Sequence, residues 1–356
     1  MKGLVLGGGF GTRLRPITHW KQKQLIPVAN KPMIEYAIDD LREAGITDIG
    51  IVYGPNKEQF HEIFGDGKKL GVKITYIEQD YPRGIAHAII VSEKFLKGEP
   101  FVMYLGDNLL KGGIKKFVKD FEASKADASI LLTHHDNPTA FGVAEVDAKG
   151  DIIKLVEKPK NPKSDLVMIG IYAFREKIYE AVNAIKPSFR NELEITDAVD
   201  YLVQKGCQVK SGIVEGWWKD TGKADDLLEA NQLILHELKP ENKGEIEKGV
   251  SLKGAVKIGK GSIIREGTVI KGPVIIGENC DIGPNSYIGP YTSLGNNIKL
   301  KNTEIEYSIV MDGSNIHCGK RIVESLIGEN CEISSNVKTR PEGHKLIIGE
   351  NSSVSL

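Results

Sequence analysis

A glycine-rich segment near the N-terminus has the composition of a phosphate-binding loop. Residues 7–14 have the sequence GGGFGTRL, so four of the five positions from 7 to 11 are glycine. Backbone N–H groups of such a segment can approach an anion closely. Arg13 and Lys23 add two cations nearby, which suits a triphosphate, because its negative charge must be neutralised before a nucleophile can approach. The glycines taken alone could also form only a tight turn.

The same loop differs from two common nucleotide-binding motifs. Leu14 stands where GxGxxG requires its third glycine, and no Gly-Lys-Ser/Thr follows as a Walker A motif requires. A simple dehydrogenase and a P-loop NTPase therefore lose support.

A carboxylate follows an apolar run farther along the chain. Asp107 comes directly after residues 101–106, FVMYLG, which have the composition of a strand. Mg²⁺ accepts one or two carboxylates together with phosphate oxygens and waters. A lone Asp after a strand is more often a cap or turn residue, so this position alone does not establish a metal site.

The elements that must position these residues alternate up to about residue 240. Runs at 4–6, 49–53, 74–77 and 101–105 have the pattern of strands, and apolar residues at i, i+3, i+4 and i+7 predict a helix over 34–41. Strands that alternate with helices predict an α/β fold with a mostly parallel sheet. In such sheets, sites gather at the carboxyl ends of the strands.

A different pattern follows the polar stretch at 239–245. Aliphatic residues recur at a strict spacing of six, which predicts a parallel β-helix in which each of them points inward: Ile258, Ile264, Ile270, Ile276, Ile282, Ile288, Leu294 and Leu300. The spacing slips after residue 300. Ile316, Ile322, Ile327 and Ile333 indicate that the coils continue.

Residues 7–33 resemble the GGxGTRLxPxT…KQLxPxxxKPM signature of the sugar-1-phosphate nucleotidylyltransferases, in particular the long-form thymidylyltransferases. The similarity continues over the first 235 residues or so. It implies a Rossmann-like nucleotidyltransferase sheet in a catalytic domain over 1–240. A left-handed β-helix domain built from hexapeptide repeats is implied over 245–356.

The resemblance also implies roles around the nucleotide. Arg13 and Lys23 would be catalytic, contacting the phosphates, and Asp107 with Asp220 would hold Mg²⁺. Gln79 and Gly84 would contact the pyrimidine, whereas His87 stands where many members carry Gln and is left without a role. The full nucleotide-binding set implied is Leu6, Gly8, Gly9, Gly11, Thr12, Gln24, Gln79, Pro82, Gly84 and Asp107.

The family's sugar side is matched by several later segments. Gly142 and Glu157 would bond to sugar hydroxyls, Lys158 and Arg190 would hold the sugar phosphate, and Gly170 lies in a matching segment. Residues 168–169, Met-Ile, depart from the common Thr or Ala and leave the preferred hexose open. Glu157 and Lys158 could instead form a surface ion pair of little energetic value.

The whole chain limits the possible partners. Its 356 residues carry a formal net charge of −1, which gives no general reason to expect nucleic acid or anionic membrane. No apolar run approaches the roughly 20 residues of a membrane span. Four scattered cysteines fit a reducing cytoplasm. We expect small-molecule substrates, a nucleoside triphosphate and a sugar-1-phosphate, and a homo-oligomer held together by the β-helix.

The reaction expected is attack of a sugar-phosphate oxygen on the α-phosphorus of dTTP, giving dTDP-glucose and pyrophosphate. UTP remains an alternative, because thymine and uracil differ by one methyl group. The β-helix raises a second alternative, an acetyltransferase tail, although its only histidines are His317 and His344 and no acyl-CoA motif stands out. A third is a non-catalytic assembly subunit, which the retained loop and carboxylates disfavour.

Overall fold

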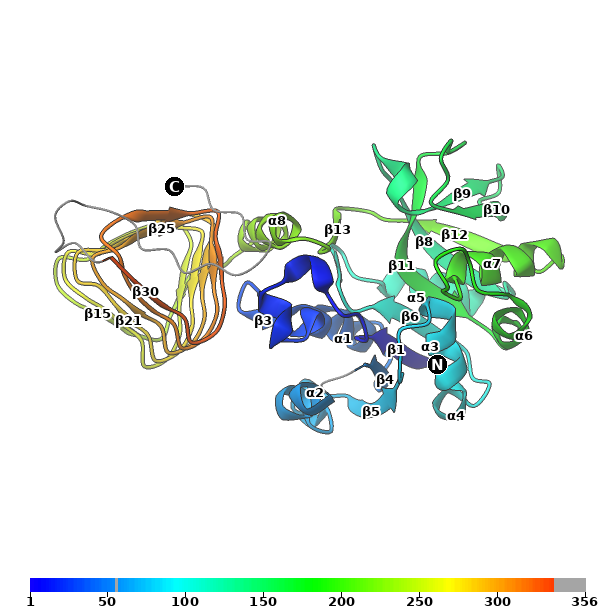
Figure 1. The fold of residues 1–356 in the computed structure, drawn as a ribbon, viewed down its shortest axis with the longest axis horizontal. Helices are drawn as coiled ribbons and strands as arrows, with labels where there is room; N and C mark the ends of the chain where they lie inside the picture. The colour runs from blue at the N-terminus through cyan, green and yellow to red at the C-terminus, as the bar shows by residue number, and fades with distance from the viewer. Residues whose placement is uncertain (55–56, 336–356) are drawn as a thin grey trace. The chain divides into compact units, whose positions relative to one another are not determined.

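The computed structural model describes residues 1–54 and 57–335. The chain divides into two compact units, Met1–Ala230 and Asn231–Leu356, and the division falls inside helix α8 (Ala224–Leu235) (Figure 1). The domain limits expected at 240 and 245 stay a prediction. Residues 336–356 of the second expected domain, with His344, lie outside the described residues.

A nine-stranded sheet forms the centre of the first unit. Its strands are β1 (Lys2–Leu6), β4 (Asp48–Tyr53), β5 (Lys73–Glu78), β6 (Phe101–Leu105), β8 (Ala128–His134), β9 (Gly142–Val146), β10 (Ile152–Glu157), β11 (Leu166–Phe174) and β12 (Val209–Ile213). The order β6-β1-β4-β5 is parallel throughout, whereas β11 runs antiparallel to β6, β8 and β9. The four predicted strands are thus confirmed and pair in parallel, as β12 also does with β8.

Helices cover both faces of this sheet, because successive strand residues point to opposite sides. Leu4 packs with one set of helices and Val5 with the other. The helices on the Leu4 side are α3 (Ile85–Val91), α4 (Glu93–Leu96), α6 (Lys177–Ala184) and α7 (Ile195–Gln204). Those on the Val5 side are α1 (Met33–Glu43), α2 (Lys57–Phe64) and α5 (Lys115–Ala123).

The predicted helix at 34–41 is confirmed within α1, whose residues at the four predicted positions are fully buried. Short elements complete the unit. They are the hairpin of β2 (Pro27–Val28) and β3 (Lys31–Pro32), the antiparallel pair of β7 (Asn108–Leu110) and β13 (Trp218–Asp220), and 3₁₀ turns at Thr12–Leu14, Ile17–His19, Lys23–Leu25, Lys68–Leu70 and Pro138–Ala140.

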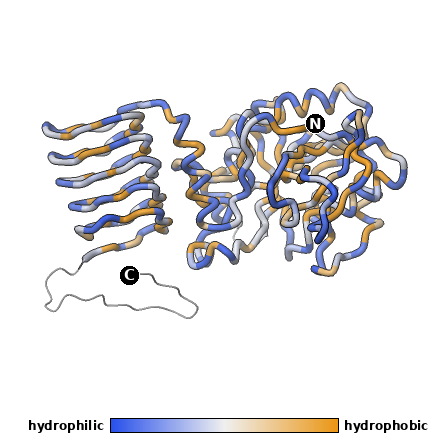
Figure 2. The backbone as a smooth tube through the Cα atoms, turned by 90° about the horizontal axis from the view of Figure 1, so that it is seen from above, coloured by the Kyte–Doolittle hydropathy of each residue, from blue (hydrophilic) through white to orange (hydrophobic). Residues whose placement is uncertain are grey.

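The second unit is a three-sided parallel β-helix (Figures 1 and 2). One side contains β14 (Glu241–Asn242), β17 (Val256–Ile258), β20 (Val274–Ile276), β23 (Thr292–Leu294), β26 (Ile309–Val310) and β29 (Leu326–Ile327). The next contains β15 (Glu245–Ile246), β18 (Ile263–Ile264), β21 (Asp281–Ile282), β24 (Lys299–Leu300), β27 (Asn315–His317) and β30 (Glu332–Ser334). The third contains β16 (Ser251–Lys253), β19 (Val269–Lys271), β22 (Tyr287–Ile288), β25 (Glu304–Glu306) and β28 (Arg321–Val323).

The aliphatic residues predicted at every sixth position fill the interior of these coils, and this part of the prediction is confirmed. The slip after Leu300 has a simple cause. The next two interior residues are Ile305 and Val310, so two sides of the coil are one residue shorter, and Ile316 restores the spacing of six. The architecture agrees with the left-handed coil that the resemblance implies.

No helix among residues 1–54 and 57–335 is long and apolar enough to cross a membrane.

Candidate active site

The glycine loop leaves the carboxyl end of β1 and lies against neighbouring backbone. The N–H of Gly7 donates to the carbonyl of Val52 at 2.7 Å, which extends the ladder between β1 and β4. Gly11 has φ +59°, and a Cβ there would lie 2.9 Å from Lys23 Cβ and from Thr18 Cγ2. Both the left-handed backbone and the lack of space require glycine at this position.

Gln22 organises the loop, and no signal in the sequence singled it out. Its Nε2 donates to the carbonyls of Gly7 and Gly9, each at 2.9 Å. The same amide donates to Oε1 of Gln24 at 3.3 Å, and both glutamines are buried. Because these carbonyls are turned inward toward Gln22, the loop is held in one conformation. Gln24, expected to bind nucleotide, accepts the hydrogen bond from Gln22 and also lies beside the loop, since a Cβ on Gly9 would be 3.6 Å from its Nε2.

Lys23 and Asp107 meet directly. Lys23 lies in the 3₁₀ turn after the loop, and Asp107 follows β6 at the carboxyl edge of the sheet. Lys23 Nζ is 2.6 Å from Asp107 Oδ2, and the lysine side chain is only 8% exposed. Asn108 Nδ2 donates to the other oxygen of Asp107 at 3.1 Å. A buried cation is thus held beside the carboxylate at the mouth of the loop.

Asp220 reaches this place through the pairing of β13 with β7, in which it stands opposite Asn108. Thr221 strengthens the link, since its Oγ1 donates to the carbonyl of Asp107 at 2.7 Å. Burial, and next the charge of Asp107, raise the pKa of Asp220 to about 6, whereas Lys23 and Arg13 oppose the rise. The two carboxylates, 113 positions apart in sequence, therefore lie close enough to interact.

This pair of carboxylates fits a divalent cation. A divalent cation between the two carboxylates would relieve the repulsion by Asp107 that helps to raise the pKa of Asp220. No group of three or more His, Cys, Asp and Glu side chains gathers into a metal site among the described residues. A site with two protein carboxylates, completed by phosphate oxygens and water, is the kind that Mg²⁺ prefers.

Arg13 lies beside the same carboxylates. A Cβ on Gly222 would be 3.1 Å from Arg13 Nη2, so the guanidinium packs against the backbone that follows Asp220. Within the part of the chain that the structure describes, Arg13 donates no hydrogen bond to another residue, and it is exposed. Thr12 next to it is also exposed, while Leu6 ends β1 and accepts a hydrogen bond from Gly106 N–H at 2.9 Å.

The segment expected to contact the base lies next to the loop. Gln79 continues β5, and a Cβ on Gly8 would lie 3.3 Å from its Oε1. Phe10 of the loop and Tyr81 of the base segment approach edge to face, with ring centroids 5.9 Å apart. Gly84 has φ +103°, and a Cβ there would collide with the carbonyl of Leu193 at 2.4 Å. Pro82 is half-buried between these residues.

The expected sugar residues form a second cluster on β9, β10 and α7. Glu157 Oε2 accepts a hydrogen bond from Thr196 Oγ1 at 2.6 Å. A Cβ on Gly142 would be 2.9 Å from Met168 Sδ and 3.2 Å from Glu157 Oε2. Gly142 therefore leaves the space in front of Glu157 open. Thr196, which holds this carboxylate, was not among the residues expected at the site.

Both expected phosphate-binding cations lie at Glu157. Lys158 Nζ and Arg190 Nη1 are each 3.7 Å from Glu157 Oε1. Arg190 also pairs with Glu192 at 3.3 Å and with Glu194 at 3.4 Å. Burial raises the pKa of Glu194. The ion pair between Glu157 and Lys158 does form, so the contacts fit either of the two interpretations of this pair.

Gly170 connects the sugar side to the metal side. It lies within β11 with φ +80°, and a Cβ there would be 2.7 Å from Leu105 Cδ1 and 3.1 Å from Asn108 Nδ2. The strand thus passes directly against the residues that carry Asp107. Trp218, another residue without an expected role, donates its indole N–H to Asn108 Oδ1 at 2.7 Å.

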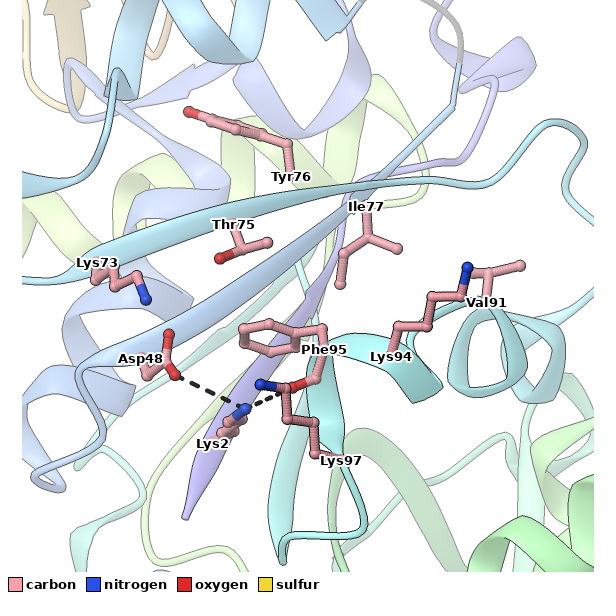
Figure 3. A pocket seen from close by; sticks show the side chains of 10 residues that line it. All are labelled: Lys2, Asp48, Lys73, Thr75, Tyr76, Ile77, Val91, Lys94, Phe95 and Lys97. Carbon is pink, nitrogen blue, oxygen red and sulfur yellow. Dashed lines mark hydrogen bonds and ion pairs between the residues drawn. The ribbon is translucent and has the colours of Figure 1, made fainter.

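A pocket of about 460 Å³ lies elsewhere, between the amino-terminal ends of β1 and β4, the length of β5, and residues of α3 and α4 (Figure 3). None of the expected site residues lines it. Lys2 is buried there, donates to the carbonyl of Phe95, and pairs with Asp48 and Glu99. The charge of Lys2 is therefore paired within the protein. The residues expected to be catalytic lie instead at the carboxyl ends of the strands.

The sequence matches the family model described as nucleotidyl transferase over residues 2–237. A second match, to the GMPPB C-terminal domain, covers residues 270–355. The chain belongs to the nucleotidyl transferase family and is an enzyme of its sugar-1-phosphate nucleotidylyltransferase class.

Several relatives match over most or all of the chain. It is 46% identical to the low-salt glycan biosynthesis nucleotidyltransferase Agl11 of Haloferax volcanii, with all of both chains covered. It is 44% identical to a glucose-1-phosphate thymidylyltransferase of Streptomyces antibioticus, covering 100% of this chain and 99% of that one. A crystal structure described as a glucose-1-phosphate thymidylyltransferase from Bacillus anthracis superposes with a TM-score of 0.63 at 38% identity, covering 68% of this chain and 98% of that chain.

Proposed function

We propose that this enzyme is a glucose-1-phosphate thymidylyltransferase, which makes dTDP-glucose and pyrophosphate from dTTP and glucose-1-phosphate. The observation that carries the proposal is the convergence of Lys23, Arg13, Asp107 and Asp220 at the mouth of the glycine loop. The similarity to thymidylyltransferases over the whole chain supports the choice of substrates.

The proposed reaction is one in-line displacement. An oxygen of the sugar phosphate attacks the α-phosphorus and forms the new P–O bond, while the bond to the β-phosphate oxygen breaks and pyrophosphate leaves. A phosphate monoester is already ionised at neutral pH, so no protein nucleophile is needed. Positioning and charge neutralisation then supply most of the acceleration.

Arg13 and Lys23 are the proposed catalytic residues. Arg13 is exposed beside Asp220 with its donors available, and Lys23 is buried at Asp107. Preorganised cations of this kind stabilise charge that develops on transferring and leaving phosphates. The loop residues at positions 8, 9, 11 and 12 would offer backbone N–H groups to the same phosphates.

Enzymes of this class use a divalent metal, and we propose Mg²⁺. Asp107 and Asp220 would hold it, and the ion would supply Lewis-acid chemistry and a fixed place for phosphate oxygens. Lys23 keeps one oxygen of Asp107 oriented, while Asn108 orients the other.

On the sugar side, Glu157 is the proposed acceptor for hexose hydroxyls, with Thr196 holding one of its oxygens. Lys158 and Arg190 would exchange their long contacts with Glu157 for the sugar phosphate, because charge-assisted bonds to a phosphate are stronger than ion pairs at 3.7 Å. Gly142 and Gly170 would leave room for the substrate.

The β-helix is proposed to hold the protomers of a homo-oligomer together. The proposed location of the enzyme is the cytoplasm. Free thiols at all four cysteines support a reducing compartment. An acetyltransferase role finds no support at His317, which lies on β27 with Asn302 Nδ2 at 3.3 Å from its Nε2. Sedimentation of the purified chain as a monomer would overturn the proposed assembly.

Pyrophosphate release tests the function. The purified chain is incubated with glucose-1-phosphate and, in turn, dTTP, UTP, ATP, GTP and CTP, with Mg²⁺ or with EDTA. Metal-dependent release that is fastest with dTTP is the expected result. A preference for UTP would keep the reaction and change the nucleotide, whereas no release with any nucleotide or sugar phosphate would contradict the proposal.

A further inference from the structure

His87 contacts the residue proposed to bind the base. It lies in α3, and its Nδ1 is 3.0 Å from Gln79 Nε2. The Gln79 side chain is buried, with 6% of the residue exposed. A buried amide at the base site can be oriented in two ways that differ in which atom faces the ligand, so its neighbours decide what it recognises.

The neighbours of Gln79 allow one orientation. Besides His87, the carbonyl of Gly84 lies 3.4 Å from Gln79 Nε2. A carbonyl oxygen only accepts hydrogen bonds, so the nitrogen side of the amide must face Gly84. Because the same nitrogen also faces the His87 ring, Nδ1 must accept, and His87 is neutral with its proton on Nε2.

This orientation leaves Oε1 of Gln79 facing the loop. Gly8 of the loop lies close to this oxygen, since a Cβ added to Gly8 would be 3.3 Å from Gln79 Oε1. Among the described residues no group donates a hydrogen bond to Gln79 Oε1, and this oxygen is accessible to solvent. A hydrogen-bond acceptor therefore stands open beside the phosphate loop.

We propose that His87 is a positioning residue that fixes the Gln79 amide and so selects nucleotides whose base carries an imide N–H. The inference rests on the proposed function and specifies its base. Thymine and uracil present a donor at N3, whereas cytosine presents an acceptor there and would face Oε1 without a hydrogen bond. A site that leaves a buried polar group unmatched discriminates strongly against that ligand.

Protonation of His87 would weaken the selection. A donor at Nδ1 would face the Gln79 nitrogen and oppose the orientation that the Gly84 carbonyl favours, so the amide would no longer be held in one orientation. Burial, and next the charge of Arg83, lower the pKa of His87, while Asp80 opposes them. Arg83 and Asp80 form an exposed ion pair at 2.9 Å, and no charged group on α4, α6 or α7, which pack around α3, contributes. The neutral ring is thus maintained at physiological pH.

The test uses the full chain and two variants. His87→Leu removes the acceptor at similar size, and His87→Asn restores one, because Asn Oδ1 can occupy the place of Nδ1. Pyrophosphate release with glucose-1-phosphate gives kcat and KM for dTTP, UTP and dCTP at about pH 7.5 and about pH 5. The lower pH is set well below the ordinary histidine pKa, because the pKa of His87 is lowered. The quantity compared is the ratio of kcat/KM for dTTP to that for dCTP.

His87→Leu is expected to lower this ratio at least ~10-fold, about the value of one hydrogen bond, with dTTP and UTP affected alike. His87→Asn is expected to keep the ratio and to remove its decline at low pH. An unchanged ratio in His87→Leu, or an equal loss for all nucleotides, would overturn the inference. If the wild type releases no pyrophosphate, the proposed function fails, but the role of His87 can still be tested. The rise in Tm that dTTP produces is then compared with the rise that dCTP produces, in the wild type and in both variants.

Discussion

The two units bring distant residues together in different ways. In the β-helix each interior residue lies over its equivalent on the next coil, so that Ile264 pairs with Ile282 and Ile282 with Leu300. In the first unit, Asp107 and Asp220 meet through the single pairing of β7 with β13 and the hydrogen bond from Thr221. The first arrangement repeats many times along the chain, and the second occurs once.

This difference separates stability from catalysis. Coils that contact only their neighbours distribute their stability over many equivalent positions. The site concentrates its chemistry in a few residues, of which Lys23 is buried and Arg13 is exposed. Substitutions inside the β-helix should therefore change unfolding and leave turnover intact, whereas substitutions at the loop should do the reverse.

The largest effect is expected for Ile264→Ala. Ile264 is fully buried in the β-helix, and removing such a side chain costs about 2–5 kcal/mol, since the rigid coils above and below cannot close the cavity. Denaturant unfolding of the second unit, followed by circular dichroism, measures it. Ile263→Ala, at the adjacent outward-facing position of the same strand, is the control. Equal costs for both variants would contradict the assigned interior.

Arg13→Ala should lower kcat roughly 10²–10³-fold, equivalent to about 3–4 kcal/mol, because one preorganised donor to the phosphates is lost. The stability of the protein should not change, since Arg13 is exposed and donates to no other described residue. The adjacent exposed Arg15 provides the control, and Arg15→Ala should retain turnover. Normal turnover in Arg13→Ala would exclude its proposed role.

The sequence predicted the β-helix well because its signal is local and repeated. Every sixth residue from Ile258 to Leu300 lies inside the coil, and a strict period is a direct record of that geometry. The slip after Leu300 was visible, but Ile305 and Val310, which end two shorter sides, were missed as interior residues. The side that ends at Ile327 is shorter as well. A shorter side keeps its inward residue but shifts the numbering, so a fixed spacing cannot detect it.

The catalytic unit was predictable only in part. Apolar runs revealed the parallel strands, and the motif indicated Arg13, Lys23 and Asp107. Spacing could not show that Asp220 joins them, because that depends on pairing between segments 113 residues apart. Gln22, Thr196 and Trp218 were missed for a related reason. They bond to carbonyls and to other site residues, and a polar residue that orients others has no distinctive pattern of its own.

A pH-dependent effect should distinguish the first unit from the second. Burial raises the pKa of Asp40 in α1 to about 7, although Tyr104 donates a hydrogen bond to it. The folded value lies above the unfolded value of about 3.9, so the stability contributed by Asp40 is complete below about pH 4 and is lost as the pH rises toward 7. Asp40→Asn should therefore stabilise the first unit by about 1–2 kcal/mol at pH 8. This is less than the full pKa shift would give at ~1.4 kcal/mol for each pKa unit, because the new amide must also find hydrogen-bond partners.

Urea unfolding of wild type and Asp40→Asn at about pH 4.5 and pH 8 measures this difference, which should nearly vanish at the lower pH. Asp39→Asn is the matched control. Asp39 pairs with Lys31 at 2.8 Å and Arg42 at 2.7 Å, so its replacement should not stabilise the protein at either pH. A stabilisation by Asp40→Asn that is equal at both pH values would show that ionisation is not its cause.

The smallest effect should appear at a corner of the β-helix. Asn297 has φ +57°, is exposed, and no hydrogen bond of its side chain is found among the described residues. Asparagine tolerates this left-handed conformation better than alanine does, so Asn297→Ala should cost about 1 kcal/mol and Asn297→Gly only a few tenths. Denaturant midpoints of the two variants measure the difference. Asn279 lies at the equivalent corner of the preceding coil and Asn285 at a different corner, and both have similar φ values. The same order of stability is expected there. A reversed order at all three would show that the side chain rather than the backbone stabilises the corners.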